Sequence, residues 1–193
     1  MLTEEQVAQA RQRAGAYFAR VGIVLTPAEA AAIEVADFGL SELETTGLAL
    51  VVYVNTARVC AKELVLLPRQ TCPEHRHPPV GSDPGKQETF RCRWGVVYLY
   101  VAGTPAQSLA ARLPAGREQT YTVRHEIVLH SGEQYTIPPD TLHWFQAGDE
   151  GAVVSEFSTQ SRDEFDIFTD PQIRRATVVG RHTKASFGTM RDV

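Results

Sequence analysis

Two histidines in the segment His75-Arg76-His77 are spaced for binding a metal ion. Successive side chains of a β-strand point to opposite faces, so both imidazoles would lie on one face of a strand. Glu88 and His143, further along the chain, would add a carboxylate and a third imidazole. Three nitrogens and one oxygen suit a divalent metal and leave open positions for a ligand. The sequence therefore predicts one metal centre, made by His75, His77, Glu88 and His143.

The region around these residues has the pattern of an all-β protein. From Gly47 onward, short segments rich in Val, Tyr, Thr and Leu alternate with turn residues, which is typical of a sandwich or barrel. A Pro/Gly-rich loop, residues 78–86, separates the histidine pair from Glu88. The predicted strands cover residues 48–55, 59–67, 88–101, 120–130, 134–137, 142–146 and 152–158.

Two short helices are predicted before the strands. Thr3 and Thr26 each begin a capping box, and Pro27 occupies the first position of the second helix, which we expect to continue to about Ala36. The apolar face of the first helix is expected to pack on the core. We expect one domain over residues 1–193, with a helical segment at 1–36, a barrel core at 47–158 and a C-terminal extension at 159–193.

Composition narrows the possible partners. The net charge is −4, from 19 basic and 23 acidic residues, which argues against a general nucleic-acid binder. Three cysteines without a CxxC motif indicate free thiols in a reducing compartment. The N-terminus lacks the pattern of a signal peptide, and no apolar run approaches the ~20 residues of a membrane span. We expect a cytoplasmic protein without a nucleic-acid or membrane partner.

The metal residues resemble the two sequence motifs of the cupin superfamily, whose members are small double-stranded β-helix (jelly-roll) barrels. The matching residues are His75, His77, Glu88 and Gly95 in the first motif, and Gly132, Pro138 and His143 in the second. The resemblance implies the cupin fold, and it implies that His125, His130 and His182, which match neither motif, are surface or structural residues.

The sequence departs from the usual cupin motifs without losing a metal ligand. Ten residues, 78–87, separate His77 from Glu88, where cupins usually have four or five. Arg69 and Asp140 stand where the motifs usually have glycine, and Ala147 replaces the usual asparagine.

The long gap before Glu88 resembles the D-lyxose isomerase family within the cupins. The resemblance runs from about residue 37 to residue 171 and includes the segment at 61–63, Lys86, the segment at 91–95, the strand at 155–158 and the acidic, aromatic stretch at 163–171. It implies an aldose–ketose isomerase that acts on a free monosaccharide such as D-lyxose or D-mannose, uses Mn²⁺ and forms a homodimer. The donor set itself also suits Co²⁺, Ni²⁺, Fe²⁺ or Zn²⁺.

An isomerase of this kind needs groups that move a proton between C1 and C2 and that bind hydroxyls. Glu156, in a mostly apolar segment, is the candidate base, and Lys86, beside a metal ligand, is a candidate donor to a substrate oxygen. Lys62 lies within an apolar strand and could point into the barrel to bind the substrate. Asp166 is a further candidate for substrate binding.

Three alternatives stay open at the level of sequence. The hydrogen could move as a hydride, which requires no base at the C–H bond. The same metal ligands could hold Fe²⁺ in a cupin dioxygenase. The barrel could also bind a sugar without turning it over.

Overall fold

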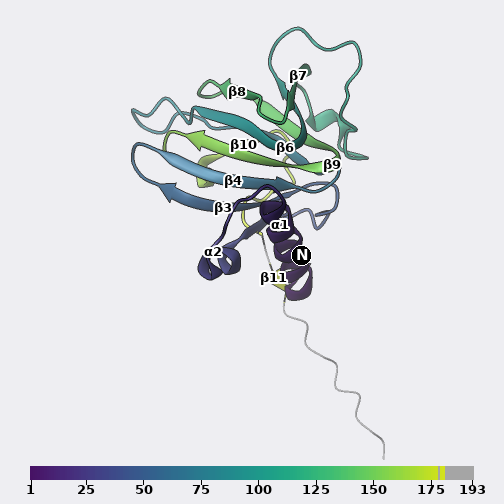
Figure 1. Cartoon of the computed structure of the whole chain (residues 1–193). Coiled ribbons are helices and arrows are strands. Elements are labelled where there is room, and N and C mark those ends of the chain that lie inside the picture. The colour runs from purple at the N-terminus through teal and green to yellow at the C-terminus, as the bar shows by residue number, and fades with distance from the viewer. Residues whose placement is uncertain (178, 181–193) are drawn as a thin grey trace, which may run out of the picture.

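The computed structural model describes residues 1–177 and 179–180, and its main element is one curled β-sheet (Figure 1). The sheet has nine antiparallel strands in the order β10-β5-β9-β4-β3-β2, and β6 pairs with β7, β8 and β9. The strands are β2 (Glu34–Ala36), β3 (Leu48–Asn55), β4 (Cys60–Leu66), β5 (Thr71–Arg76), β6 (Glu88–Val101), β7 (His125–His130), β8 (Gln134–Ile137), β9 (His143–Ser158) and β10 (Ile167–Phe168).

Two helices and a small second sheet complete the described elements. The helices are α1 (Glu4–Arg20) and α2 (Pro27–Ala32), and the short strands β1 (Leu2–Thr3) and β11 (Val179–Gly180) pair in parallel. Single 3₁₀ turns lie at Glu118–Thr120 and Asp163–Phe165. Among the described residues, no helix is both long and apolar enough to cross a membrane.

The sheet curls because two long strands, β6 and β9, bend together. The first part of β9 pairs with β5 and its last part pairs with β4, while β6 runs along both parts. Register shifts in the β6–β9 ladder mark the bend. Gly95 lies there with φ +79°, and a Cβ at this position would be 2.2 Å from the carbonyl oxygen of Gly151. Only glycine allows the two strands to approach this closely.

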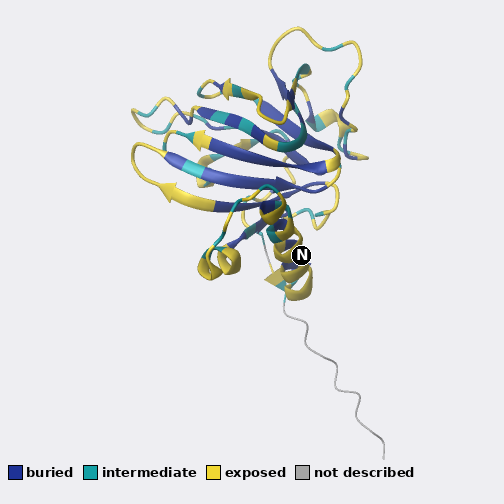
Figure 2. Cartoon of the chain, viewed as in Figure 1, coloured by how far each residue is buried: buried dark blue, intermediate teal, exposed yellow. Residues whose placement is uncertain are grey.

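The apolar core lies on the concave side of the sheet, and α1 covers part of the convex side. Figure 2 shows the central strands β4 and β9 as mostly buried. Ala14 and Phe18 of α1 pack with Val51, Val65 and Val153 on the convex side. The predicted apolar face of the first helix is therefore confirmed as a packing face, and the fold class predicted from the sequence is confirmed.

Both predicted capping boxes are present, but the predicted end of the second helix was wrong. Helix α2 ends at Ala32, and residues 34–36 form β2, which pairs with β3. Alanine favours helix in isolation, yet burial of Val35 and Ala36 against the sheet outweighs that preference.

Three predicted strands match at both ends, and the one at 59–67 exceeds β4 by one residue at each end. The strand list missed β5, and it was wrong at two further places. The strands at 48–55, 88–101 and 134–137 match β3, β6 and β8 at both ends. The segments at 142–146 and 152–158 form one strand, β9, because its irregular middle continues in the same direction. The strand expected from residue 120 begins at His125, since residues 118–120 form a 3₁₀ turn.

Candidate metal centre and active-site pocket

Three of the predicted metal ligands come together on neighbouring strands. His75, in β5, pairs directly with His143, the first residue of β9, and their rings lie 4.3 Å apart. His77 follows the end of β5, with its ring 4.9 Å from that of His75. All three imidazoles are buried, and one ligand atom from each lies within 4.8 Å of the others. The prediction that the His-x-His pair shares one face is confirmed.

Each imidazole is held in a defined orientation through its Nδ1 atom. Nδ1 of His75 lies 2.8 Å from the carbonyl oxygen of Pro73, and Nδ1 of His143 lies 2.8 Å from that of Thr141. A carbonyl oxygen only accepts, so both Nδ1 atoms must carry the proton. Nδ1 of His77 bonds the carboxylate of Asp166. This arrangement leaves the Nε2 lone pairs of His75 and His143 as ligands, as in metal sites oriented by outer partners.

Glu88, the fourth predicted ligand, lies beside the histidines at the first position of β6. Its Oε1 atom lies 2.9 Å from Nε2 of His143 and 3.2 Å from Nε2 of His77. Nε2 of His143 is nevertheless a buried atom without a hydrogen-bond partner among the described residues, because its proton is on the other nitrogen. Nε2 of His143 and Oε1 of Glu88 therefore both offer an electron pair at the same place, which fits a cation bound between them. A mixed imidazole–carboxylate set suits a divalent metal.

Electrostatics keep His75 and Glu88 in the form that a metal needs, whereas Glu88 and Asp166 outweigh burial and raise the pKa of His77 to about 9, so His77 must lose a proton to bind a metal. Burial, together with the neighbouring His143 and His77, holds the pKa of His75 well below its ordinary value, so this imidazole is neutral. Burial alone would raise the pKa of Glu88, but Lys86 and His77 bring that pKa well below its usual range. Glu88 is therefore ionised, as a carboxylate ligand must be.

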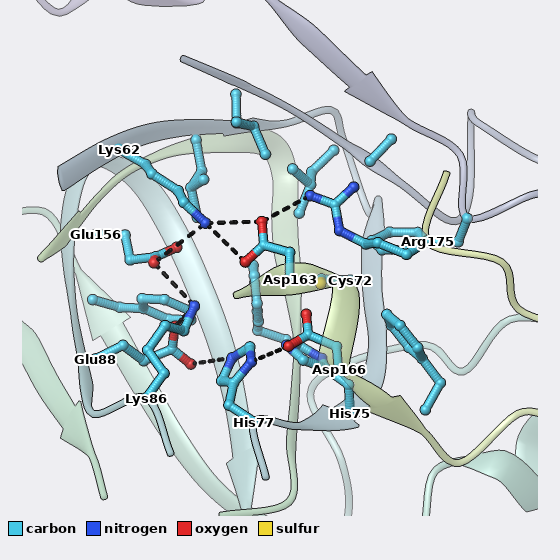
Figure 3. Close-up of a pocket in the computed structure, with 18 residues that line it drawn as sticks. Lys62, Cys72, His75, His77, Lys86, Glu88, Glu156, Asp163, Asp166 and Arg175 are labelled. Carbon is cyan, nitrogen blue, oxygen red and sulfur yellow. Dashed lines mark hydrogen bonds and ion pairs between the residues drawn. The ribbon is translucent and has the colours of Figure 1, made fainter. Parts of the chain in front are cut away.

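A second group of buried charged side chains lies beside the histidines (Figure 3). Nζ of Lys86 lies 2.7 Å from Oε2 of Glu88 and 3.1 Å from Oε1 of Glu156. Lys62 of β4 stands opposite Glu156 in the β4–β9 ladder, with Nζ 3.8 Å from the same Oε1. The predicted inward orientations of Lys62 and Glu156 are confirmed. Lys86 thus joins a predicted metal ligand to the candidate base.

Lys86 is protonated in this environment. Burial lowers the pKa of its ammonium, but Glu156, Glu88 and Asp163 outweigh that effect and raise the pKa well above its ordinary value. Lys86 can therefore donate hydrogen bonds and stabilise negative charge, and it cannot serve as a base near neutral pH.

The loop before β6 delivers Lys86 through a glycine. Gly85 has φ +101°, and a Cβ there would lie 2.4 Å from the carbonyl oxygen of His77. The loop therefore folds back onto the histidine pair at a place where no other residue fits. This contact explains how ten extra residues before Glu88 still keep Lys86 at the site.

Two pocket residues that the sequence did not predict come from the segment after β9, residues 159–175, which we call the strap. Asp163 Oδ2 lies 3.1 Å from Nζ of Lys62 and 3.0 Å from Nη2 of Arg175. Arg175 also reaches Glu34 at 2.6 Å. Asp163 belongs to the acidic stretch noted in the sequence, so the stretch was a signal for it. No such signal marked Arg175, because the isolated pair Arg174-Arg175 has the sequence pattern of ordinary surface charge.

Asp166 is also part of the strap, and the structure places it against a metal ligand. Its carboxylate bonds Nδ1 of His77. Its predicted role in substrate binding stays a prediction, and its observed contact is with the imidazole.

The wall facing the charged groups is apolar. It combines aromatic and aliphatic side chains from β2 and the residues just after it, from β3, β4, β6 and β9, and from the strap. The residues are Ala36, Phe38, Leu48, Leu50, Leu64, Phe90, Phe145 and Phe168. A pocket with charged hydrogen-bonding groups on one side and carbon on the other suits a molecule that has hydroxyls and an apolar face.

The two residues that stand in place of the usual cupin glycines share a left-handed backbone conformation. Arg69 has φ +57° and Asp140 has φ +54°, the left-handed region that glycine adopts most easily. Asp140 forms an ion pair with Arg76, the residue between His75 and His77 in the sequence. The turns are therefore kept although the glycines are not.

The two remaining histidines that the structure describes lie outside the candidate metal centre. His125 is half-buried, with Nδ1 2.9 Å from the carbonyl oxygen of Thr104, and His130 is exposed. His182 lies outside the described residues, so its predicted surface or structural role stays a prediction.

A curled antiparallel sheet that gathers three buried histidines defines a protein of cupin-like fold with a cluster that could hold a metal ion. The chain belongs to the D-lyxose isomerase family, whose sequence profile matches residues 28–187.

Similar proteins carry names that agree with this family. The chain is 65% identical over 171 residues to a D-lyxose ketol-isomerase of Cohnella laeviribosi, covering 89% of this chain and 94% of the relative. It is 62% identical over 175 residues to a D-lyxose/D-mannose isomerase of Thermosediminibacter oceani, covering 91% and 97%. The solved L-ribose isomerase of Cellulomonas parahominis with L-ribose has a TM-score of 0.78 at 17% identity, covering 93% of this chain and 98% of that one. At such low identity this likeness shows the fold alone.

Proposed function

We propose that this protein is a metal-dependent aldose–ketose isomerase that converts D-lyxose to D-xylulose and D-mannose to D-fructose. Family membership and the names of relatives at 62% and 65% identity support the reaction and the sugars. D-lyxose and D-mannose share their configuration at C2 and C3, so one pocket can accept the reacting end of both.

In this proposal His75, His77, His143 and Glu88 hold the metal, which we infer to be Mn²⁺. When bound, the ion supplies a Lewis acid that polarises the carbonyl and hydroxyl oxygens at C1 and C2 of the sugar. The mixed nitrogen and oxygen donors favour a first-row divalent ion over Mg²⁺ or Ca²⁺. A metal panel on protein stripped with EDTA would separate Mn²⁺ from Co²⁺, Ni²⁺, Fe²⁺ and Zn²⁺.

Glu156 is the proposed base. It would take the proton from C2 of the aldose and return it to C1, while the proton of the C2 hydroxyl passes to the C1 oxygen, so that the aldose becomes the ketose through an enediol. Lys86, with Nζ 3.1 Å from its Oε1 atom, forms an ion pair with this carboxylate inside the pocket. Because Lys86 also contacts Glu88 at 2.7 Å, it can donate to a substrate oxygen that sits between the metal site and the base.

Lys62 is the proposed donor to the remaining hydroxyls. Its ammonium is anchored by Ser161 at 2.8 Å and by Asp163, and it faces the same pocket as Glu156. The apolar wall opposite would cover the carbon face of the sugar and exclude water. We assign Asp166 first to orienting His77, since its carboxylate bonds Nδ1 of that imidazole.

The observation that carries the proposal is the Lys86 bridge between the metal ligand Glu88 and the base Glu156. A cupin oxygenase that takes an apolar substrate has no evident use for two buried ammonium groups beside the metal site. The family match also favours an isomerase over an oxygenase and over a non-catalytic sugar-binding protein.

The test is a panel of free aldoses incubated with the protein and Mn²⁺, with EDTA-treated protein as the control. We expect ketose from D-lyxose and D-mannose, and none after metal removal. Oxygen consumption with Fe²⁺ in the absence of any ketose would support the oxygenase instead. Sugar binding without ketose from any aldose would overturn the assignment.

We further propose that the protein is a homodimer in a reducing, cytoplasmic compartment. The dimer rests on the resemblance to cupins, which commonly pair through strands. The compartment is supported by three buried free cysteines, Cys60, Cys72 and Cys92. Light scattering on the eluting protein would give twice the mass of the 21.3 kDa chain.

A further inference from the structure

Glu74 is a buried carboxylate that neither lines the pocket nor takes part in the proposed reaction. It precedes His75 in β5 and is 1% exposed. Its Oε2 accepts hydrogen bonds from the backbone N–H groups of Thr122 at 2.6 Å and Val123 at 2.9 Å. Its Oε1 accepts from the hydroxyls of Thr122 at 2.8 Å and Thr169 at 2.7 Å. A buried carboxylate with four donors is rigidly held, and it holds its donors equally firmly.

One of these donors connects Glu74 to the strap. The Thr169 backbone N–H also donates to the carbonyl oxygen of Glu74 at 3.1 Å, so both its main chain and its side chain attach the strap to β5. Immediately before Thr169, the ring of Phe168 lies 5.4 Å from that of His75, and Asp166 bonds His77. The strap therefore reaches two predicted metal ligands next to the point where Glu74 fastens it.

We propose that Glu74 is a positioning residue for the metal centre. By holding Thr169, it fixes the strap so that Asp166 sets the orientation of the His77 imidazole. Metal sites depend on such outer contacts, because a ligand whose ring can turn binds the ion less tightly. The inference rests on the metal centre of the proposed function.

The hydroxyls of two threonines donate to the same oxygen, Oε1 of Glu74, and they provide a matched pair of variants. Thr169→Val removes the hydroxyl bond to the strap, and Thr122→Val removes a hydroxyl bond of almost equal length to the loop before β7. Both changes keep the shape of the side chain and leave Oε1 of Glu74 with one remaining hydroxyl donor. Only the first change acts on the segment that contacts the metal ligands.

The measurement is the dissociation constant of Mn²⁺, determined by calorimetry on EDTA-stripped full-length protein. We expect Thr169→Val to weaken Mn²⁺ binding about fivefold or more and Asp166→Asn to weaken it about 10- to 100-fold, as for outer-shell partners in general. Thr122→Val should leave the constant within about twofold of wild type, because its hydroxyl bond is a step removed from any ligand partner. Urea unfolding of the two valine variants should be similar. The double variant Thr169→Val, Asp166→Asn should bind no more weakly than Asp166→Asn alone, since the effect passes through Asp166.

Equal Mn²⁺ affinities of Thr169→Val and Thr122→Val would overturn the positioning role while leaving the proposed function intact. Additive losses in the double variant would also overturn it, because Thr169 would then act by another route. Absence of divalent metal binding by the wild-type protein would instead remove the proposed function, and this inference with it.

Discussion

The pocket has two halves that are built in different ways. The half with the predicted metal ligands, which we call the metal half, combines three histidines and Glu88 from the ends of adjacent strands, and backbone carbonyls orient two of the rings. The charged half, with Lys62, Lys86, Glu156, Asp163 and Arg175, comes from two strands, a loop and the strap, and it is held by ion pairs. Strand pairing positions the first half, whereas the second half depends on ion pairs, so the loss of one partner leaves a buried charge unpaired.

The comparison indicates a division of labour. In our account the metal half binds and polarises the two reacting oxygens, and the charged half moves the proton and binds the remaining hydroxyls. Lys86 is the residue that touches both halves, through Glu88 and Glu156. A change confined to one half should therefore alter either metal binding or proton transfer, and a change at Lys86 should alter both.

The largest effect is expected from removing the metal half. Chelation of the metal, or His143→Ala, should lower kcat by about a thousandfold or more, because several kcal/mol of Lewis-acid stabilisation are lost. Ketose formation from D-lyxose measures the loss, and circular dichroism checks that the sheet is intact. Activity that survives EDTA with no bound metal would contradict the division.

Glu156→Gln should have the next largest effect. The amide has nearly the same shape but cannot take a proton, so kcat should fall by about 10²- to 10⁴-fold. The dissociation constant of Mn²⁺ should stay close to that of wild type, because Glu156 is not a proposed ligand. A variant that loses metal but keeps turnover per bound metal would reverse the assignments of the two halves.

A smaller effect that touches both halves is expected from Lys86→Met. Removing the ammonium leaves two buried carboxylates without their shared cation, so kcat should fall by about 10- to 100-fold and Mn²⁺ affinity should change as well. Lys62→Met is the matched control in the charged half, and it should change KM and kcat without changing Mn²⁺ affinity. Identical profiles for the two lysine variants would show that Lys86 does not join the halves.

The smallest effect concerns acid stability of the charged half. Burial would raise the pKa of Asp163, but Lys62, Lys86, Ser161 and Arg175 bring it well below its ordinary value. The charged carboxylate therefore adds stability that is complete above the unfolded pKa of about 3.9 and is lost as pH falls through the lower folded pKa. Asp163→Asn should be less stable than wild type at pH 6, by urea unfolding of metal-free protein, and the difference should shrink below about pH 4. A difference that widens in acid would have the wrong sign.

The two halves also differ in how far the sequence predicts them. Residue spacing predicted His75, His77, Glu88 and His143, because strand alternation and motif order are local signals. Glu156 and Lys86 were found only with the help of a family resemblance.

Arg175 was missed because its position depends on where the strap crosses the barrel. No local pattern encodes that crossing. For the same reason the end of the second helix was wrong, since pairing with β3 decided the structure of residues 34–36.

The most direct test of the account is single-turnover conversion of D-lyxose carrying deuterium at C2, in ordinary water, followed by mass spectrometry of the ketose. If Glu156 moves a proton, part of the deuterium should exchange with solvent and be missing from C1 of the product. Glu156→Gln should give no labelled or unlabelled ketose on the same time scale. Complete retention of deuterium at C1, with full activity in Glu156→Gln, would contradict proton transfer and would show that the hydrogen moves as a hydride.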